Sequence, residues 1–400
     1  MIGLITQPIG LQAAYLQQVF SVAGQLNYPT NPPLYSPVLQ AIVSINGIEQ
    51  DAVLKFTSAT LTDMGGGFWS YLFDADISEV LQEYFKNNAT LPAMCSNQIH
   101  IDDPITYVVT FTEFYESGGI MVKNPTTSTT APLRAFNASL PVFFEQDLGR
   151  FDPLLPPSDF LTNKPKHARV VCREDCESIT ILDWTGVFSY IAYDASGTQI
   201  GIGTYSDAGA SGQITLPTGP ANLSAFTWDA QSGAFPNDPN TASYTVGVAG
   251  ASELLRYYVS KSCCTTYRIV FLNMYGAYDY FSISKFQDES FIVKSDDFER
   301  IWGSHSYDVR GLNRVQAYGQ DVFKIEQVRV HKDTVVWLKE LLNSSDVYLE
   351  NMTIPPEHSE VGRLAVVVKD ATFKTIRSES DYLEFECTLV ASTRWFSQRN

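Results

Sequence analysis

Short stretches in which apolar and polar residues alternate run through most of the chain. The clearest is ITYVVTFTEFYE at 105–116, and LYSPVLQAIVSING at 34–47 and DAVLKFTSATLTD at 51–63 also read as strands. A period of two places alternate side chains on opposite faces of a strand. Because Gly, Pro and Asn punctuate these stretches, the pattern predicts a chain built mainly from β-strands.

Two segments instead carry the spacing of an amphipathic helix. The first follows Asp76 and Ser78, either of which can cap it, and its apolar face holds Val80, Leu81, Tyr84 and Phe85. The second begins at Asp333 or Thr334, and its apolar face holds Val335, Leu338, Leu341 and Leu342, with Trp337 beside them. The fold class is therefore mainly β with two notable helices, and 400 residues exceed a single ordinary core.

Changes in composition divide the chain into three parts. Residues 1–165 predict a β-rich domain with one helix and a projecting Thr- and Pro-rich loop at 123–140, ending in a proline-dense segment. Residues 166–251 predict a β-sandwich-like domain without helices, and YDASGTQI at 193–200 within it predicts a hairpin. Residues 252–400 predict a mixed β domain with the second helix.

Charge and leader patterns narrow the classes of function. The formal net charge is -17, which does not suit binding to nucleic acid through phosphate neutralisation. The start of the chain lacks the basic, apolar and small-residue regions of a secretory signal, and no apolar run reaches the length of a membrane span. We therefore expect reduced thiols, although Cys172 and Cys176 are spaced for a small disulfide loop or half of a zinc site.

The motifs of common enzyme chemistries are missing from the sequence. There is no nucleophile elbow, no phosphate-binding Gly-rich loop, and no pair of histidines at metal-ligand spacing. Asp183, Asp194 and Asp229 lie near Trp184, Tyr193 and Trp228, which leaves three interpretations open: a sandwich core, a sugar-binding face, or a glycosidase pair. We expect no catalytic, cofactor-binding or metal-binding residues.

A tyrosine-rich turn, FLNMYGAYDYFSISKF at 271–286, has no catalytic group beside it. Tyrosine rings suit a subunit interface, where they bury a large area while the hydroxyl keeps a partner. We expect Asp279 to cap the turn by accepting backbone N–H bonds. The subunit-interface candidates are Tyr275, Tyr278, Tyr280 and Trp302, together with Asn124, Thr126 and Thr127 of the loop at 123–140, which we expect to be an arm held by a neighbour.

The last third of the chain resembles virion proteins of tailed phages that infect Bacteroidetes. The resemblance rests on an Asn-x-x-Gly-x-x-Asp-x-Phe turn, a tryptophan-led helix and a closing strand pair. The matching positions are Asn273, Gly276, Asp279 and Phe281 in the turn, Trp337, Leu341, Ser344, Val347, Tyr348 and Leu349 after it, and Arg399 and Asn400 at the close. APLRAFNASLPVFFEQ and FLTNKP are similar to the same group. The resemblance implies a tail or baseplate location and no particular chemistry.

Together these observations predict a structural protein of a phage tail. We expect a ring-forming component of the tail tip, baseplate or connector, located in the virion and assembled in the host cytoplasm. Its partners would be copies of itself and other tail or connector proteins, with neither specific nucleic-acid binding nor a membrane span. The alternative is a carbohydrate- or receptor-binding tail module with host surface glycans as its partner, and a glycan-degrading enzyme is the third.

Overall fold

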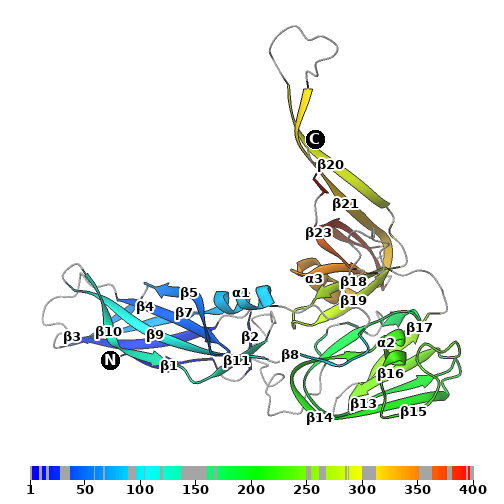
Figure 1. Ribbon diagram of the computed structural model, residues 1–400, viewed down its shortest axis with the longest axis horizontal. Coiled ribbons are helices and arrows are strands. Elements are labelled where there is room, and N and C mark those ends of the chain that lie inside the picture. Colours follow the sequence, from blue (N-terminus) through cyan, green and yellow to red (C-terminus); the bar gives the residue numbers. More distant parts are fainter. Residues whose placement is uncertain are drawn as a thin grey trace, which may run out of the picture.

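The computed structural model describes residues 2–8, 11–14, 18–27, 37–57, 59–65, 68–88, 96–102, 104–117, 120–136, 160–162, 164–165, 169–248, 254–260, 267–283, 286, 288–299, 312–350, 363–375, 381–392 and 395–396. Strands make up 64% of the structure and helices 10%, which confirms the mainly β fold class. The strands form several antiparallel sheets, and Figure 1 shows them gathered into three parts of the molecule.

The N-terminal part contains two sheets that share one core. The first has the order β1 (Ile2–Thr6), β3 (Val19–Asn27), β7 (Phe68–Asp76) and β6 (Thr60–Gly65). The second has the order β2 (Leu11–Ala13), β11 (Leu133–Phe136), β9 (Ile105–Ser117), β4 (Val38–Ile45) and β5 (Ile48–Phe56). Phe20 and Phe111, one from each sheet, bring their ring centroids to 5.5 Å. Burial along β4 alternates strictly, as its sequence pattern predicts.

The first predicted helix is confirmed as α1 (Ser78–Asn88), and its Leu81 is buried in the N-terminal core. The side chain of Asp76 accepts hydrogen bonds from the backbone N–H groups of Ser78 and Gln18. A carboxylate at the start of a helix satisfies N–H groups that the helix leaves unpaired. Asp76 therefore both starts the helix and ties it to β3.

The loop predicted at 123–140 is wrong in both halves, because it overlaps two strands, β10 (Ile120–Thr129) and β11, and its residues 137–140 lie outside the described ones. Strand β10 pairs with β9 and shifts register between Lys123 and Thr127. Threonine is a polar residue, but its branched Cβ suits a strand. Thr130, directly after β10, accepts a hydrogen bond from the N–H of Val109 through its hydroxyl. The segment is thus part of the sheet and does not project as a loop.

The middle part is a sheet dominated by one long hairpin. Its order is β12 (Val170–Val171), β17 (Leu255–Val259), β16 (Ser243–Val248), β13 (Ser178–Tyr193), β14 (Gln199–Pro217) and β15 (Ala230–Gly233), and β8 (His100–Asp102) pairs with β14. The predicted hairpin is confirmed as the β13–β14 turn, where Gly197 has φ +83°. Strand β17 follows the predicted boundary at 251, and β8 precedes the one at 165, so this sheet draws on all three predicted domains.

The expectation that the middle part has no helix is wrong. A short helix, α2 (Pro220–Ala225), follows β14 and begins with Pro220. Proline fits the first helical position because its missing N–H would have no partner there. Leu223 of this helix is buried in the core below the sheet, beside Phe188 and Phe226.

The C-terminal part is a sheet covered by the second predicted helix. Its order is β19 (Tyr278–Ile283), β18 (Tyr267–Leu272), β22 (Val347–Glu350), β23 (Arg363–Thr375), β24 (Tyr382–Ala391), β21 (Leu312–His331) and β20 (Asp288–Glu299), and β25 (Trp395–Phe396) pairs with β21. Helix α3 (Thr334–Asn343) confirms the prediction and buries Trp337, Leu338 and Leu341 against the sheet.

Strands β20 and β21 continue beyond the C-terminal sheet as a two-stranded ribbon (Figure 1). We call the whole hairpin of β20 and β21 the arm, and Asp288–Val293 lie at its base, where β21 also pairs with β24 and β25. Strand β20 stands last in the strand order of its sheet, so one of its edges lacks a neighbour within the described strands. The arm points away from both the N-terminal and the middle parts in Figure 1, which places it where another molecule can reach it.

Candidate functional site: a buried polar junction between two sheets

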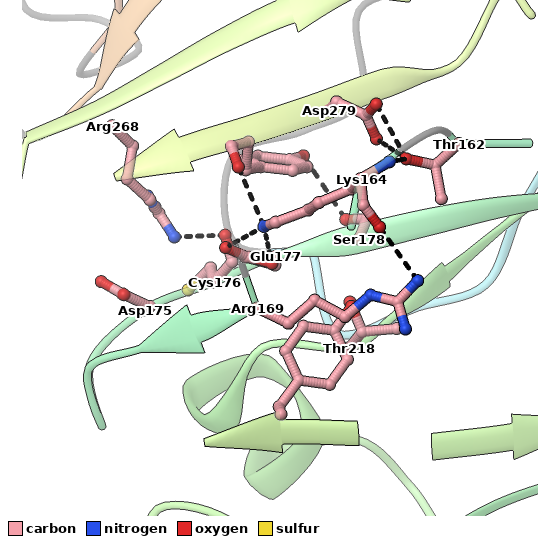
Figure 2. Close-up of polar contacts among 12 residues, drawn as sticks. Thr162, Lys164, Arg169, Asp175, Cys176, Glu177, Ser178, Thr218, Arg268 and Asp279 are labelled. Carbon is pink, nitrogen blue, oxygen red and sulfur yellow. Dashed lines mark hydrogen bonds and ion pairs between the residues drawn. The ribbon is translucent and has the colours of Figure 1, made fainter. Parts of the chain in front are cut away.

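The middle and C-terminal sheets meet at a cluster of buried polar side chains (Figure 2). We call this cluster the sheet junction and define it as Thr162, Lys164, Glu177, Arg268, Asn273, Asp279, Trp337 and Glu350. Residues 160–162 and 164–165 lie between the two sheets, and the N–H of Leu161 donates to the carbonyl of Thr180 at the start of β13. The proline-rich segment thereby presents Thr162 and Lys164 to the C-terminal sheet.

Asp279 of β19 is the first anchor of the junction. Its carboxylate accepts hydrogen bonds from the hydroxyl of Thr162 at 2.8 Å, from Trp337 Nε1 at 2.8 Å and from Asn273 Nδ2 at 3.1 Å. The side chain is buried, and burial raises the pKa of this carboxyl above its ordinary value, while those hydrogen bonds oppose the shift. Asp279 thus joins the turn, helix α3 and the segment that precedes the middle sheet.

The expectation that Asp279 caps its own turn is wrong. Asn273 takes that role, because its Oδ1 accepts from the N–H groups of Tyr275 and Ala277, both at 3.0 Å. An asparagine side chain commonly bonds to the backbone two residues ahead in this way. Gly276 has φ +75°, which completes the turn. Asn273 Nδ2 also donates to the carbonyl of Leu161 at 2.8 Å, so the turn itself holds the adjoining segment.

Lys164 and Glu177 form the second anchor. Lys164 Nζ lies 2.9 and 2.8 Å from the two carboxylate oxygens of Glu177 and donates to the carbonyl of Tyr280 at 2.9 Å. The two side chains are 7% and 2% exposed. Burial raises the pKa of Glu177, and the positive charge of Lys164 is the first influence against that rise. A lysine from the proline-rich segment is therefore held by both sheets at once.

Arg268 of β18 is the third anchor and extends the junction across the C-terminal sheet to β22 and β23. It donates to the carbonyl of Cys176, and its Nη2 lies 2.8 Å from Glu350 Oε2. Arg363 Nε approaches the other oxygen of Glu350 at 2.6 Å. These side chains are all buried, and each charge has an opposite charge beside it. Buried ions persist in proteins when they are paired in this way.

Cys176, next to Glu177, is part of a disulfide whose other half lies outside the described residues. The expectation of reduced thiols is therefore wrong at this position. Cys172 and Cys387 keep their thiols, so the small loop between Cys172 and Cys176 does not form. Spacing along the chain does not decide a pairing, because a disulfide needs two Cα atoms within about 7 Å in the fold.

The sheet junction links the middle and C-terminal sheets to each other. The cavity lined by Thr162, Lys164, Arg169, Glu177 and Asp279 has room for about one water molecule. The charged side chains of the sheet junction bind one another, or they donate hydrogen bonds to backbone carbonyls across the junction. Further cross-links run from Gln213 Nε2 to the carbonyl of Tyr275 at 3.1 Å and from the Tyr280 hydroxyl to Ser178 at 3.5 Å.

The predicted interface tyrosines fall in different environments. Tyr275 and Tyr280 are buried within the chain, beneath the middle sheet, so neither offers a surface to a partner. Tyr278 is half-buried and keeps exposed area. The physical reason is that even-numbered residues of β19 face the middle sheet, whereas Phe281 and Ile283 face the core under α3.

The structure describes some of the other interface candidates. Thr126 and Thr127 are exposed on β10, and the side chain of Asn124 and the whole of Trp302 lie outside the described residues. The structure does not bring Thr126 or Thr127 together with the tyrosines, because β10 belongs to an N-terminal sheet and β19 to the C-terminal sheet.

Two of the acids considered for a sugar site, Asp194 and Asp229, accept hydrogen bonds from backbone N–H groups. Asp194 accepts from the N–H groups of Ser196 and Thr198 in the β13–β14 hairpin, and Asp229 accepts from the N–H of Ser206. Trp228 packs against Phe188 and Phe226 and belongs to the middle core. The side chains of Asp183 and Trp184 lie outside the described ones. For Trp228, the core interpretation fits the structure.

Only weak signals for the junction are present in the sequence. Arg268 stands inside the apolar run YRIVFL, and a charge within a buried strand needs a partner. Lys164 and Glu177 had no such context. By contrast, three positions on which the phage resemblance rests do meet in space, because Asn273 and Trp337 both donate to Asp279.

No family model matches the chain, and no curated protein sequence matches it. Within the described residues, no group of three or more His, Cys, Asp or Glu side chains is arranged to hold a metal ion. The helices described in the structure are all too short or too polar to cross a membrane.

Proposed function

We propose that this chain is a structural subunit of a phage tail, a ring-forming component of the tail tip, baseplate or connector that acts by assembling with its neighbours. The observation that carries the proposal is the arm. Phe291, Ile292 and Val293 are consecutive on β20 and are 53%, 45% and 52% exposed. An edge strand with exposed apolar side chains invites aggregation unless a partner covers it.

The sheet junction supports the same proposal. A subunit that transmits force or keeps register in a ring needs its parts held in one orientation. Buried, paired charges define an orientation because a misaligned pair leaves an ion without compensation. The Lys164–Glu177 and Arg268–Glu350 pairs meet this requirement between the middle and C-terminal sheets. The base of the arm is in the second of these sheets, so the junction sets its direction relative to the middle sheet.

The resemblance of residues 273–349 to phage virion proteins adds a location. Its turn and helix positions are the ones that form the Asp279 anchor. The residues of this motif therefore have a structural role, which is consistent with a protein that acts by assembly. The glycan-binding alternative loses part of its basis, because Trp228 packs against the middle core and Asp229 accepts a hydrogen bond from the backbone N–H of Ser206 in β14.

The test is the copy number of this chain in purified phage particles that encode it. Quantitative mass spectrometry with isotope-labelled peptides would give its copies relative to a tail protein of known stoichiometry. We expect several copies per particle, in a whole-number ratio that a closed ring allows. Absence from the particle, or a single copy in each, would overturn the proposal.

A further inference from the structure

An exposed face of the middle sheet carries an arginine held between two tyrosine rings. The guanidinium carbon of Arg256 lies 5.6 Å from the ring centroid of Tyr193 and 5.5 Å from that of Tyr258. Burial along β17 alternates so that Arg256 and Tyr258 both point outward. Arg256 Nη2 also donates to the hydroxyl of Ser243 at 3.2 Å. We call Tyr193, Arg256 and Tyr258 the tyrosine–arginine face.

This face has the chemistry of a protein contact. Tyr258 is 49% exposed, and its parallel neighbour Val170 is also 49% exposed. Arginine and tyrosine are the residues most often found at the energetic centre of interfaces. The two rings and Ser243 hold the guanidinium in place, which lowers the conformational entropy lost when a partner binds. The Arg256 guanidinium is surrounded by apolar side chains. It therefore suits a partner surface that is apolar and has carboxylates at its edge.

The arm offers such an edge. Exposed Asp288 and Glu289 precede Phe291, Ile292 and Val293 on β20, with Ser290 between the two groups. The Phe291 ring covers Gly319 of the paired strand so closely that a Cβ there would stand 1.8 Å from Cζ. An aromatic ring resting on a cross-strand glycine is held in one orientation. Phe291 and Val293 face one side of β20 and Ile292 faces the other, so the free edge of the strand carries exposed apolar side chains on both sides, near two carboxylates.

The two surfaces cannot satisfy each other within one chain as it is folded. Both are exposed at the same time, and they belong to different sheets that the junction holds in a defined orientation. A contact between them must then join two copies. Because the two surfaces differ, the contact is heterologous, and repeating it closes a ring when the rotation allows.

We propose that the β20 edge of the arm of one copy docks on the tyrosine–arginine face of the next copy. The inference rests on the proposed function and names the contact by which the ring forms. Asp288 and Glu289 supply the charge that Arg256 attracts, and Phe291, Ile292 and Val293 cover Tyr258 and Val170. The complementary charges also favour this pairing between chains that each carry a net charge of -17.

The test uses the full chain and measures self-association by sedimentation velocity up to about 100 μM, a range that detects weak contacts. Arg256→Glu should weaken association by about thirtyfold or more, as loss of a central arginine does. Ile292→Asp should do the same from the other surface. The matched controls are Lys332→Glu, an exposed charge reversal, and Val336→Asp, an exposed apolar position on α3, and neither should change association. Val293→Asp and Tyr258→Ala repeat the test on each surface.

Mixing the two variants gives the decisive result. A copy with Arg256→Glu keeps an intact arm, and a copy with Ile292→Asp keeps an intact face, so an equimolar mixture should form dimers that neither variant forms alone. A monomeric wild type over this range, variants that associate like wild type, or folded variants that fail to complement each other would each overturn the inference. Wild-type binding to immobilised acidic glycans that Arg256→Glu abolishes, without self-association, would also overturn it. Any of these outcomes leaves the copy-number test of the proposed function standing on its own.

Discussion

Removing the charge of Lys164 should destabilise the protein strongly. In Lys164→Met the side chain keeps much of its length, but Glu177 loses both close contacts to Nζ while staying 2% exposed. Breaking a buried ion pair on one side costs about 3–5 kcal/mol, because the remaining charge stays buried without compensation. For domains of this size we expect the thermal midpoint to fall by about 6–20 °C.

The pH dependence of this variant identifies the cause. Burial raises the pKa of Glu177, so the folded state holds that proton at a pH where the unfolded chain has lost it. Its contribution to stability is therefore full below the unfolded pKa and is lost as pH rises through the native pKa. Lys164 opposes the rise, so its removal moves the native pKa of Glu177 further up. The penalty of Lys164→Met should be largest at a pH above the native pKa of Glu177 and should shrink as the pH falls through it.

The assay is differential scanning calorimetry of wild type, Lys164→Met and the double variant Lys164→Met/Glu177→Leu at several pH values. The double variant should recover most of the loss, since an apolar pair can replace a buried ion pair. Lys374→Met, which removes an exposed partner of Glu386, is the matched control and should leave the midpoint close to wild type. A Lys164→Met penalty below about 1 kcal/mol, or one that does not change with pH, would refute this account of the junction.

Three further predictions concern the same region. Trp337→Phe removes the 2.8 Å hydrogen bond to Asp279 and should lower the free energy of unfolding by about 1–3 kcal/mol in urea titration, and an unchanged value would mean that water replaces the indole N–H. Gly276→Ala places a side chain at φ +75° and should destabilise by about 1 kcal/mol in the same assay, whereas a neutral result would show that the turn relaxes. Burial raises the pKa of the Cys387 thiol to about 12, so iodoacetamide near pH 8 should leave this residue unlabelled in the native protein and label it in denaturant, as peptide mass mapping would show. Native labelling of Cys387 would contradict its burial in the C-terminal core.

Local pattern was sufficient for most of the secondary structure. Helices α1 and α3 and the β13–β14 hairpin follow from periodicity and turn residues, because these signals act between neighbours in the chain. The misreadings have local causes too. The segment of β10 is polar, so its composition indicated a loop although threonine favours strands. Helix α2 has only six residues, which are too few to show a helical period of apolar residues. Domain limits were harder, because β8 and β17 join a sheet whose main strands lie elsewhere in the sequence.

The resemblance to phage virion proteins included Asn273, Asp279 and Trp337 but did not indicate what these residues do. Their task depends on distance in space, since 58 residues separate Trp337 from Asp279 and 117 separate Thr162 from it. The same holds for the tyrosines, because a turn in sequence does not say which sheet will cover Tyr275 and Tyr280.

The sequence by itself determined most of the strands, the two longer helices and the Gly276 turn, since each depends on residues within a few positions of one another. Only the tertiary structure decided which charges are buried and with what partner. Lys164 and Glu177 have the sequence context of ordinary charged residues, and they become a buried pair only because two sheets close over them and remove the water that would otherwise solvate them. That desolvation belongs to no segment of the chain, and for this reason the junction could not be predicted from the sequence.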